Sequence, residues 1–287
     1  MQKSVFVFIT TMAIISSEYC HADNAENSVN ILQKGAYNDA QAVQLATEDS
    51  HIQILTDGDH NHVKVHQQDV QSTSSIVNQS HVSQANLAAI RQQDSQTSEA
   101  KIHQGNSEEN TALITQNQSG MVSAEIDQQH SHLSESRIAQ SNSASTQAHI
   151  TQESLSDSTA LIDQHNSHQS RASVSQQESA QSLGHITQQH ANNSQAHIQQ
   201  RNSEGVGNTA LIEQNGGDEL SASLGQHGPD NWGEIRQSGV DQSAVIEQRS
   251  TAPSLPGNDA WIIQSSGANE GRILQFGIDN NASIHQF

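Results

Sequence analysis

The sequence predicts an all-β fold, a β-solenoid of about 11 two-strand coils stacked in an amyloid-like manner. Three observations predict it. The motif Ala-x-Ile-x-Gln returns every 12 residues through the middle of the chain, so that each strand–turn–strand arm has about 12 residues. Apolar and polar residues alternate within the motif, which is typical of a half-buried strand. No proline interrupts a motif, as a hydrogen-bonded sheet requires.

The motif is clearest in residues 100–128, where Ala100, Ile102 and Gln104 are followed by the same pattern in 112–116 and 124–128. We expect the glutamines to form stacked rows, and these are Gln92, Gln104, Gln116, Gln128, Gln140, Gln152, Gln164, Gln176, Gln188, Gln200, Gln214 and Gln226. The branched residues of the same arms are expected to fill the core, and these are Ile102, Ile114, Ile126, Ile138, Ile150 and Ile162.

Alternation places the alanine, isoleucine and glutamine of an arm on one side, and residues such as Lys101 and His103 on the other. Stacking coils at about 4.8 Å would bury each isoleucine against its counterparts above and below. A single arm cannot bury that face, so the repeat is stable only when stacked. The alternative is a disordered Ser/Gln/Asn tract, and the strict phase of the motif argues against it.

Residues 1–22 have the features of a secretory signal peptide. Lys3 supplies a positive start, residues 5–15 form a short apolar run, and Cys20-His21-Ala22 fits a cleavage site before Asp23. The apolar run is too short for a membrane span. Cleavage would remove the only cysteine, leaving a mature chain without disulfides. Residues 23–28 are predicted to be a polar N-terminal export segment, and residues 29–287 to be the solenoid repeats.

The first arms depart from the motif, which suits an atypical cap or a mobile first coil. We place them at residues 29–33, 40–44, 52–56, 63–67, 74–78 and 88–92, with Thr56 and Asn78 standing where glutamine is expected. After Gln200 the spacing varies from 11 to 16 residues. Each change falls between arms, and the gaps hold Pro229, Pro253 and Pro256.

A stack of coils ends in open strand edges, which most proteins cover to avoid aggregation. Here the last arm, with Ala282, Ile284 and Gln286, runs to within one residue of the C-terminus. We therefore predict that this arm is a polymerisation edge and that its partner is another copy of the chain. Each added coil would bury two branched side chains, at roughly 1.5–3 kcal/mol each.

The repeat resembles that of curlin-repeat proteins, the subunits of the extracellular curli amyloid of bacterial biofilms. The second half of the curlin repeat, Asn-x-Ala-x-Val-x-Gln, is matched at residues 110–116, 208–214 and 258–264, with isoleucine in place of valine. Residues 275–287 resemble the end of the major curli subunit. The chain has about twice the usual number of repeats, and Ser, His and Gln mostly replace the glycine-rich turns.

The resemblance implies a structural subunit of an extracellular fibre at the bacterial cell surface, exported through the periplasm and supporting biofilm matrix and adhesion. It implies self-assembly into a homopolymer. It also implies a nucleator subunit, a dedicated outer-membrane secretion pore and a periplasmic chaperone as partners. A nucleator or minor-subunit role is an alternative, for which Arg236, Arg249 and Arg272 near the end are a hint.

Charge and motifs argue against other classes of function. The formal net charge of −20 argues against nucleic acid as a partner. No catalytic or phosphate-binding motif is present, so we expect neither an enzyme nor a cofactor. The remaining rival is a monomeric secreted β-solenoid that binds a surface such as ice or a glycan. The residues at the middle outward position are too mixed for an ice-binding face, and the glycine-rich calcium repeat is missing. A passive adhesin segment is a third alternative.

The 17 histidines are expected to be solvated surface residues. His60 with His62, and His130 with His132, would place two imidazoles on one face of an extended segment, but no repeated Cys/His spacing supports a metal site. Because histidine titrates between about pH 7 and 5, acidification would cancel most of the negative charge and speed assembly.

Overall fold

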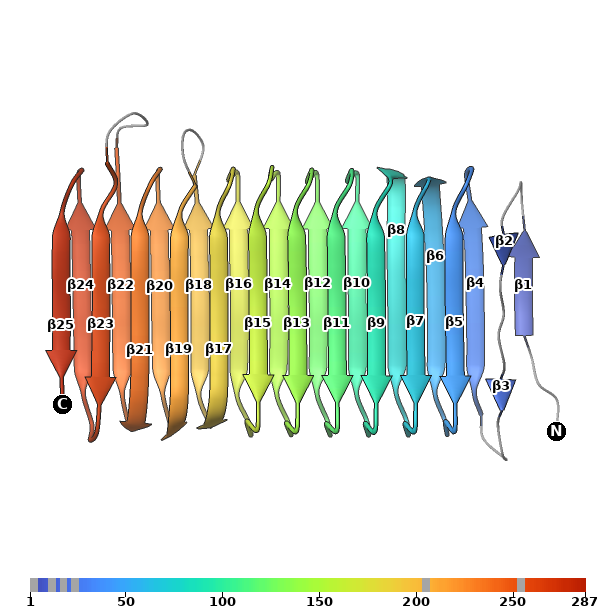
Figure 1. Ribbon diagram of the computed structural model, residues 1–287, viewed down its shortest axis with the longest axis horizontal. Coiled ribbons are helices and arrows are strands. Elements are labelled where there is room, and N and C mark those ends of the chain that lie inside the picture. The colour runs from blue at the N-terminus through green and yellow to red at the C-terminus, as the bar shows by residue number, and fades with distance from the viewer. Residues whose placement is uncertain (1–4, 10–13, 16–19, 22–25, 203–206, 252–255) are drawn as a thin grey trace. The chain divides into compact units, whose positions relative to one another are not determined.

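The computed structural model describes residues 5–9, 14–15, 20–21, 26–202, 207–251 and 256–287. Its regular elements are all strands, which confirms the predicted all-β solenoid (Figure 1). The chain divides into two compact units, Met1–Ser145 and Thr146–Phe287. No helix in the described ranges is long and apolar enough to cross a membrane.

The first unit begins with three short strands, β1 (Val5–Ile9), β2 (Ile14–Ile15) and β3 (Cys20–His21). Its solenoid strands follow: β4 (Ser28–Lys34), β5 (Asp39–Leu45), β6 (His51–Asp59), β7 (His62–Gln68), β8 (Ser74–Gln84), β9 (Leu87–Gln93), β10 (Glu99–Gly105), β11 (Thr111–Asn117), β12 (Ser123–Gln129) and β13 (Glu135–Ser141).

The second unit contains β14 (Gln147–Glu153), β15 (Thr159–His165), β16 (Arg171–Gln177), β17 (Leu183–Asn192), β18 (Gln195–Arg201), β19 (Thr209–Asp218), β20 (Ser221–His227), β21 (Trp232–Val240), β22 (Ser243–Arg249), β23 (Asp259–Ser265), β24 (Glu270–Phe276) and β25 (Asn281–Gln286).

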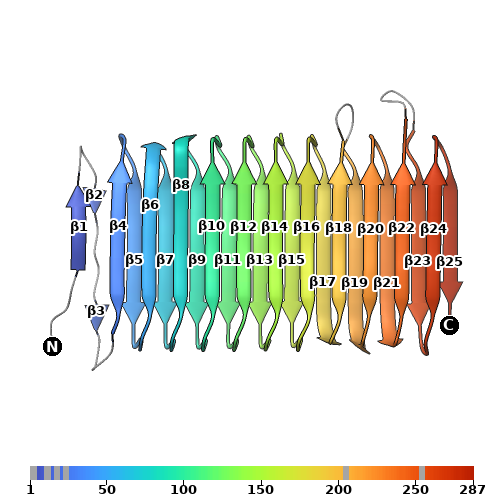
Figure 2. The same ribbon diagram turned by 180° about the vertical axis from the view of Figure 1, so that it is seen from behind.

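Strands pair in parallel with the second strand before and after them, so each unit holds one sheet of even-numbered and one of odd-numbered strands (Figures 1 and 2). One even strand and the odd strand that follows it make one coil. The register between coils follows the sequence period: Ile102 of β10 lies beside Ile126 of β12, and Gln104 beside Gln128. Like residues therefore stack on like residues.

The core lies between the two sheets of each unit and is made of the motif residues. In β11, Ala112, Ile114 and Gln116 are fully buried, while Leu113 and Thr115 between them face outward. The alternation of apolar and polar residues in the sequence thus corresponds to the alternation of side chains between the two faces of the strand.

The small first residue of the motif makes room for the glutamines of the opposite sheet. Gly184 of β17 stands at this position, and a Cβ atom there would lie 3.3 Å from Gln200 Oε1 and 3.4 Å from Gln176 Nε2. The Cγ1 of Val174 would be only 2.7 Å away. Since the strands of the two sheets run in opposite directions, the Ala or Gly of one arm faces the Gln of the other, and the pair fills a constant width.

The turns are tight corners in which some side chains are buried and others are exposed. Between β10 and β11 the backbone is left-handed at Asn106 (φ 50°) and again at Glu109 (φ 54°). These two bends turn Ser107 and Asn110 inward, where both are buried. Ser107 Oγ lies 3.0 Å from Gly105 O and 3.2 Å from Gln128 O, so the buried hydroxyl has a carbonyl to donate to.

One predicted arm was wrong by one residue. The sequence predicts that Ser74, Ile76 and Asn78 point inward, whereas Ser75, Val77 and Gln79 of β8 are the buried ones. Val77 lies beside Ile102, and Gln79 beside Gln104. A one-residue shift exchanges the two faces of a strand. The observed register gives Gln79 a glutamine partner, which the shorter Asn78 would not have supplied in the same way.

Strand β1 pairs in parallel with β4, from Val5 beside Val29 to Ile9 beside Gln33, and both β2 and β3 pair with β5. The predicted cleavage site before Asp23 falls outside the described residues. The solenoid strand β4 starts at Ser28. Asn27 is tied to the next coil, since its Nδ2 donates to Thr47 O (2.7 Å) and its Oδ1 accepts from Ser50 N (3.0 Å).

The left-handed corners give a test of the turn geometry. Met121 has a φ of 54° and is 63% exposed, so replacing it changes little besides the backbone preference. Met121→Asn should raise the free energy of unfolding by about 0.5–1 kcal/mol, because asparagine tolerates this region. Met121→Val should lower it by about 1 kcal/mol or more, since a β-branched residue does not. Urea denaturation measures both.

Thr115→Asn, at an exposed strand position, is the control and should not stabilise the protein. Equal stabilities of the asparagine and valine variants at position 121 would contradict the left-handed corner.

Candidate functional site

The predicted glutamines and isoleucines are all in the core. Each of the glutamines from Gln92 to Gln226 and each of the six isoleucines from Ile102 to Ile162 is no more than 2% exposed. What they form is a pair of amide rows inside each unit.

A glutamine row is the set of inward glutamines of one sheet, joined side chain to side chain. In the odd sheet of the first unit, each Nε2 donates to the Oε1 of the next coil at 2.7–3.0 Å. The members are Gln44, Gln67, Gln92, Gln116 and Gln140. The even sheet has the same bonds among Gln79, Gln104 and Gln128, at 2.8 Å.

The second unit repeats the arrangement with rows that reach its last coil. The even row joins Gln152, Gln176, Gln200, Gln226, Gln248 and Gln275 at 2.8–3.0 Å. The odd row joins Gln164, Gln188, Gln214, Gln237, Gln264 and Gln286 at 2.7–2.9 Å. In all four rows the amide nitrogen donates toward the C-terminal coil.

In many of these amides the second N–H donates to a backbone carbonyl of the opposite sheet. Gln226 Nε2 donates to Thr209 O at 2.8 Å, and Gln248 Nε2 to Trp232 O at 2.8 Å. One side chain therefore joins neighbouring coils and also the two sheets. A net contribution of about 0.5–1.5 kcal/mol per hydrogen bond is modest, but a buried amide left without partners costs about 1–3 kcal/mol. The rows thus specify the register strongly.

The even row of the first unit is interrupted at Thr56. This residue is fully buried in β6, in the position that a glutamine takes in other coils. Its short side chain reaches neither neighbour. As a result Gln33 Nε2, Thr56 Oγ1 and Gln79 Oε1 are all buried without a hydrogen-bond partner. The inward position of Thr56 was predicted correctly from the sequence, but this gap was not.

The predicted polymerisation edge is the open side of β24 and β25. Among the described residues β25 pairs only with β23, so its other side offers a full set of backbone donors and acceptors. Ala282, Ile284 and Gln286 point inward but remain half-exposed, because no coil covers them. Gln286 Oε1 accepts from Gln264, and its Nε2 donates to Glu270 O at 3.1 Å.

A second buried row, formed by asparagines at the corners, was not predicted. Asn38, Asn61, Asn86 and Asn110 succeed one another in the first unit, and each Oδ1 accepts the backbone N–H of the next at 2.9–3.2 Å. Asn208, Asn231, Asn258 and Asn280 do the same in the second unit at 2.8–3.3 Å. The signal was present in the sequence, since most of these residues stand two positions before the motif alanine.

The histidine pairs do not lie as a metal site would require. His60 is left-handed (φ 59°) and stacks on Tyr37 at 4.9 Å, while His62 Nδ1 lies 3.0 Å from Asp39 Oδ2. His130 is also left-handed (φ 52°). Neither pair therefore occupies one face of a strand. The described residues contain no cluster of three or more His, Cys, Asp or Glu that could hold a metal ion.

Two histidines have perturbed acidities. Burial, together with the nearby cations Arg91 and Lys64, lowers the pKa of His66 below its usual value. Burial alone lowers the pKa of His197. Both therefore stay neutral to a lower pH than free histidine does.

No protein-family model matches the sequence, and no curated protein is significantly similar to it. The fold and the glutamine rows are therefore the features that bear on function.

The gap at Thr56 gives a test of the glutamine rows. Thr56→Gln should raise the free energy of unfolding by about 1–3 kcal/mol, because the new amide can accept from Gln33 Nε2 and donate to Gln79 Oε1. Urea denaturation and hydrogen exchange of β6 amides measure the gain. Leu55→Gln adds the same side chain at the neighbouring outward position and should give no gain. A destabilised Thr56→Gln protein would contradict the proposed continuity of the row.

Proposed function

We propose that the chain is a structural subunit that polymerises by stacking its coils end to end into an extracellular, curli-like amyloid fibre. The single observation that carries the proposal is the open edge at β25, where an in-register sheet and a glutamine row both stop without a cap in the described residues. An edge of this kind is a template for another strand.

The first and last coils have complementary hydrogen-bonding groups. At the C-terminal end, Gln275 and Gln286 are the last members of their rows, and every row donates in that direction. In the first coil, Gln33 Oε1 and Gln44 Oε1 are buried acceptors without a donor. A second copy placed after β24 and β25 would supply these acceptors at the positions where the rows end.

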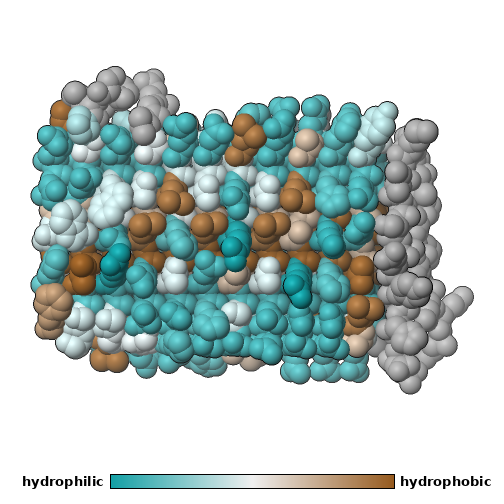
Figure 3. All heavy atoms as spheres, in the orientation of Figure 1, coloured by the Kyte–Doolittle hydropathy of each residue, from teal (hydrophilic) through white to brown (hydrophobic). Residues whose placement is uncertain are grey.

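Apolar side chains also gather at the proposed growing end. Among the described residues of the second unit, the exposed large apolar side chains are Val240, Leu274, Phe276, Ile278 and Phe287, and four of these five lie in or after β24. The face seen in Figure 3 is largely hydrophilic along its upper and lower margins, and most of its apolar residues lie along the middle, interspersed with polar ones. Clustered apolar exposure marks interaction surfaces. The C-terminal coil is therefore the part of the second unit that exposes most of its large apolar side chains.

The N-terminal edge is occupied by β1, β2 and β3 in the full chain. In the proposal residues 1–22 are a signal peptide, so export removes these strands and opens β4 and β5. The resemblance to curlin-repeat proteins supports secretion through the periplasm, a dedicated outer-membrane pore with a periplasmic chaperone, and a nucleator subunit. The chain has no proposed catalytic role or cofactor.

A charge at the edge tests the proposal. In a chain that lacks residues 1–22, Ile284→Lys should slow fibre growth at least tenfold, because the added coil would bury an ammonium group without a partner. Dye-binding kinetics measure growth, and fibre diffraction with reflections near 4.8 and 10 Å identifies the product.

Ser283→Lys is the matched control, since it places the same charge on the outward side of the same strand. It should leave growth within about twofold of the parent. Parent protein that stays monomeric, or an Ile284→Lys protein that grows as fast as the parent, would exclude this edge as the growth site.

Growth should also depend on pH. Lowering the pH from about 7 to 5 should shorten the lag time, because histidines gain charge and reduce the repulsion between subunits of net charge −20. In contrast, lowering the pH should decrease the folding stability of the single chain through His66 and His197. Their pKa values are lowered in the folded state, so their contribution to stability is present above pH 6.5 and is lost as the pH falls through their folded pKa values.

Lag times and urea midpoints should therefore be measured at each pH, with sodium chloride added as a control that screens the charges. Lag times that are equal across the range would show that charge repulsion does not limit assembly.

A further inference from the structure

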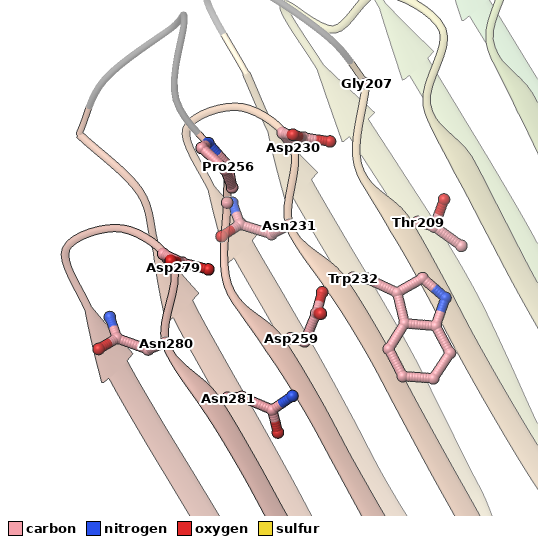
Figure 4. Close-up of a pocket in the computed structure, with 11 residues that line it drawn as sticks. Gly207, Thr209, Asp230, Asn231, Trp232, Pro256, Asp259, Asp279, Asn280 and Asn281 are labelled. Atoms are coloured by element: carbon pink, nitrogen blue, oxygen red, sulfur yellow. The ribbon is translucent and has the colours of Figure 1, made fainter.

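A groove of about 350 Å³ lies at the beginning of the odd strands in the second unit (Figure 4). It is distinct from the glutamine rows and from the open edge. Its side wall is made by the first residues of four neighbouring strands of the odd-numbered sheet, which are Thr209 of β19, Trp232 of β21, Asp259 of β23 and Asn281 of β25. The register places each of them directly beside the next, at steps of about 4.8 Å.

The rim of the groove includes residues of the turns before β21 and β25, together with Gly207, Pro256 and Gly257. Asp230 and Asp279 are both left-handed, with φ values of 58° and 55°, and both are exposed. The corner asparagines between rim and wall are already committed to their own row, for example Asn231 N to Asn208 Oδ1 at 2.8 Å. The corners therefore form a fixed floor, and the outward side chains are free to contact a ligand.

Five polar groups around the groove have no partners among the described residues. Within the described part of the chain, the carboxylates of Asp230, Asp259 and Asp279, the Asn281 amide and the Trp232 Nε1–H make no hydrogen bond or ion pair. In contrast, the neighbouring acids Glu213 and Glu234 pair with Arg236, at 3.6 and 2.6 Å. Both acceptors and donors thus line one groove without being used by the fold.

Trp232 supplies a braced aromatic surface in this hollow. Its ring centroid lies 6.2 Å from that of Trp261, at an interplanar angle of 68°, so the second indole supports it edge to face. Trp261 in turn donates its Nε1–H to His285 Nε2 at 3.1 Å. These are the only two tryptophans in the sequence. Both belong to neighbouring strands on one face.

We propose that this groove binds a neutral oligosaccharide. A sugar ring offers a C–H face that packs on an indole, and hydroxyl groups that donate to carboxylates and exchange hydrogen bonds with an amide. Three unpaired carboxylates exclude phosphates and acidic polysaccharides. The described residues also hold no metal-binding cluster, which argues against a cation as the ligand. The volume is at the lower end of the range for ligand sites, which fits one or two sugar rings of a longer chain.

Sugar binding of this kind does not depend on fibre formation. The wall residues lie outward on strands whose inward residues form the core, so the groove is present in a single chain and remains open when coils are added beyond β25.

The test uses intrinsic fluorescence, since all tryptophan emission comes from this face. The full chain is titrated with β-1,4-linked tetramers of glucose and of N-acetylglucosamine, and affinities are measured by calorimetry. At least one tetramer should shift the emission. Trp232→Ala should weaken its binding about tenfold, whereas Trp232→Phe, which keeps an aromatic ring, should stay within about threefold of the parent.

Trp261→Phe leaves Trp232 as the only emitter and should still report the ligand. Leu113→Ala, an outward change in the first unit, is the control and should leave the affinity unchanged. The proposal is overturned by the absence of binding for both tetramers at about 10 mM, by binding that Trp232→Ala does not weaken, or by tighter binding of calcium or a lysine tetramer than of either sugar.

Discussion

The structure depends on the hydrogen bond between the side-chain amides of glutamines in successive coils. Apart from Gln286 in the last strand, these amides are buried, so they must find partners in the protein. A glutamine satisfies this requirement only when another stands beside it in register, as Gln92 Nε2 does with Gln116 Oε1 at 2.7 Å. A shift of one residue would turn the isoleucines and the glutamines outward together, and a shift of two residues would place each amide beside an apolar side chain that cannot hydrogen-bond to it. The polar row therefore fixes the register, and the apolar row provides the burial.

The motif Ala-x-Ile-x-Gln can be understood from the two sheets together. The Cβ position of Gly184 shows how little space is left at the first inward site, because two amides and Val174 surround it. Gly233 and Gly271 occupy the equivalent site in other arms, close to Leu224 and Ile262 respectively. A small residue at one end of the motif is thus the counterpart of a long one at the other end, across the core.

Much of the fold follows from the sequence because a 12-residue period leaves little choice of architecture. The inward residues from Gln92 onward were predicted correctly for that reason. The error at residues 74–78 arose because two patterns, Ser-x-Ile-x-Asn and Ser-x-Val-x-Gln, overlap there by one residue, and only contact with Gln104 separates them. The corners could not be predicted from propensity, since residues such as Met121 and Leu133 take left-handed backbone that they rarely adopt. Tertiary packing imposes that conformation.

The candidate sites differ in how far the sequence indicates them. The edge at Ala282, Ile284 and Gln286 was visible as the last arm of the repeat. The groove was not, because Trp232, Asp259 and Asn281 are separated by irregular spacers and come together only through the register of β21, β23 and β25. Because the spacing between these residues is irregular, their adjacency in the stacked coils could not be read from the sequence.

Because all the row amides donate in the same direction, each unit of the solenoid has a polarity. Within each unit every side-chain dipole of a row adds to the previous one, so the two faces of a coil differ electrostatically although their residues are the same. A subunit turned end for end would oppose donor to donor and acceptor to acceptor. A filament of such subunits is polar and has two chemically different ends. Its two ends are therefore expected to elongate at different rates.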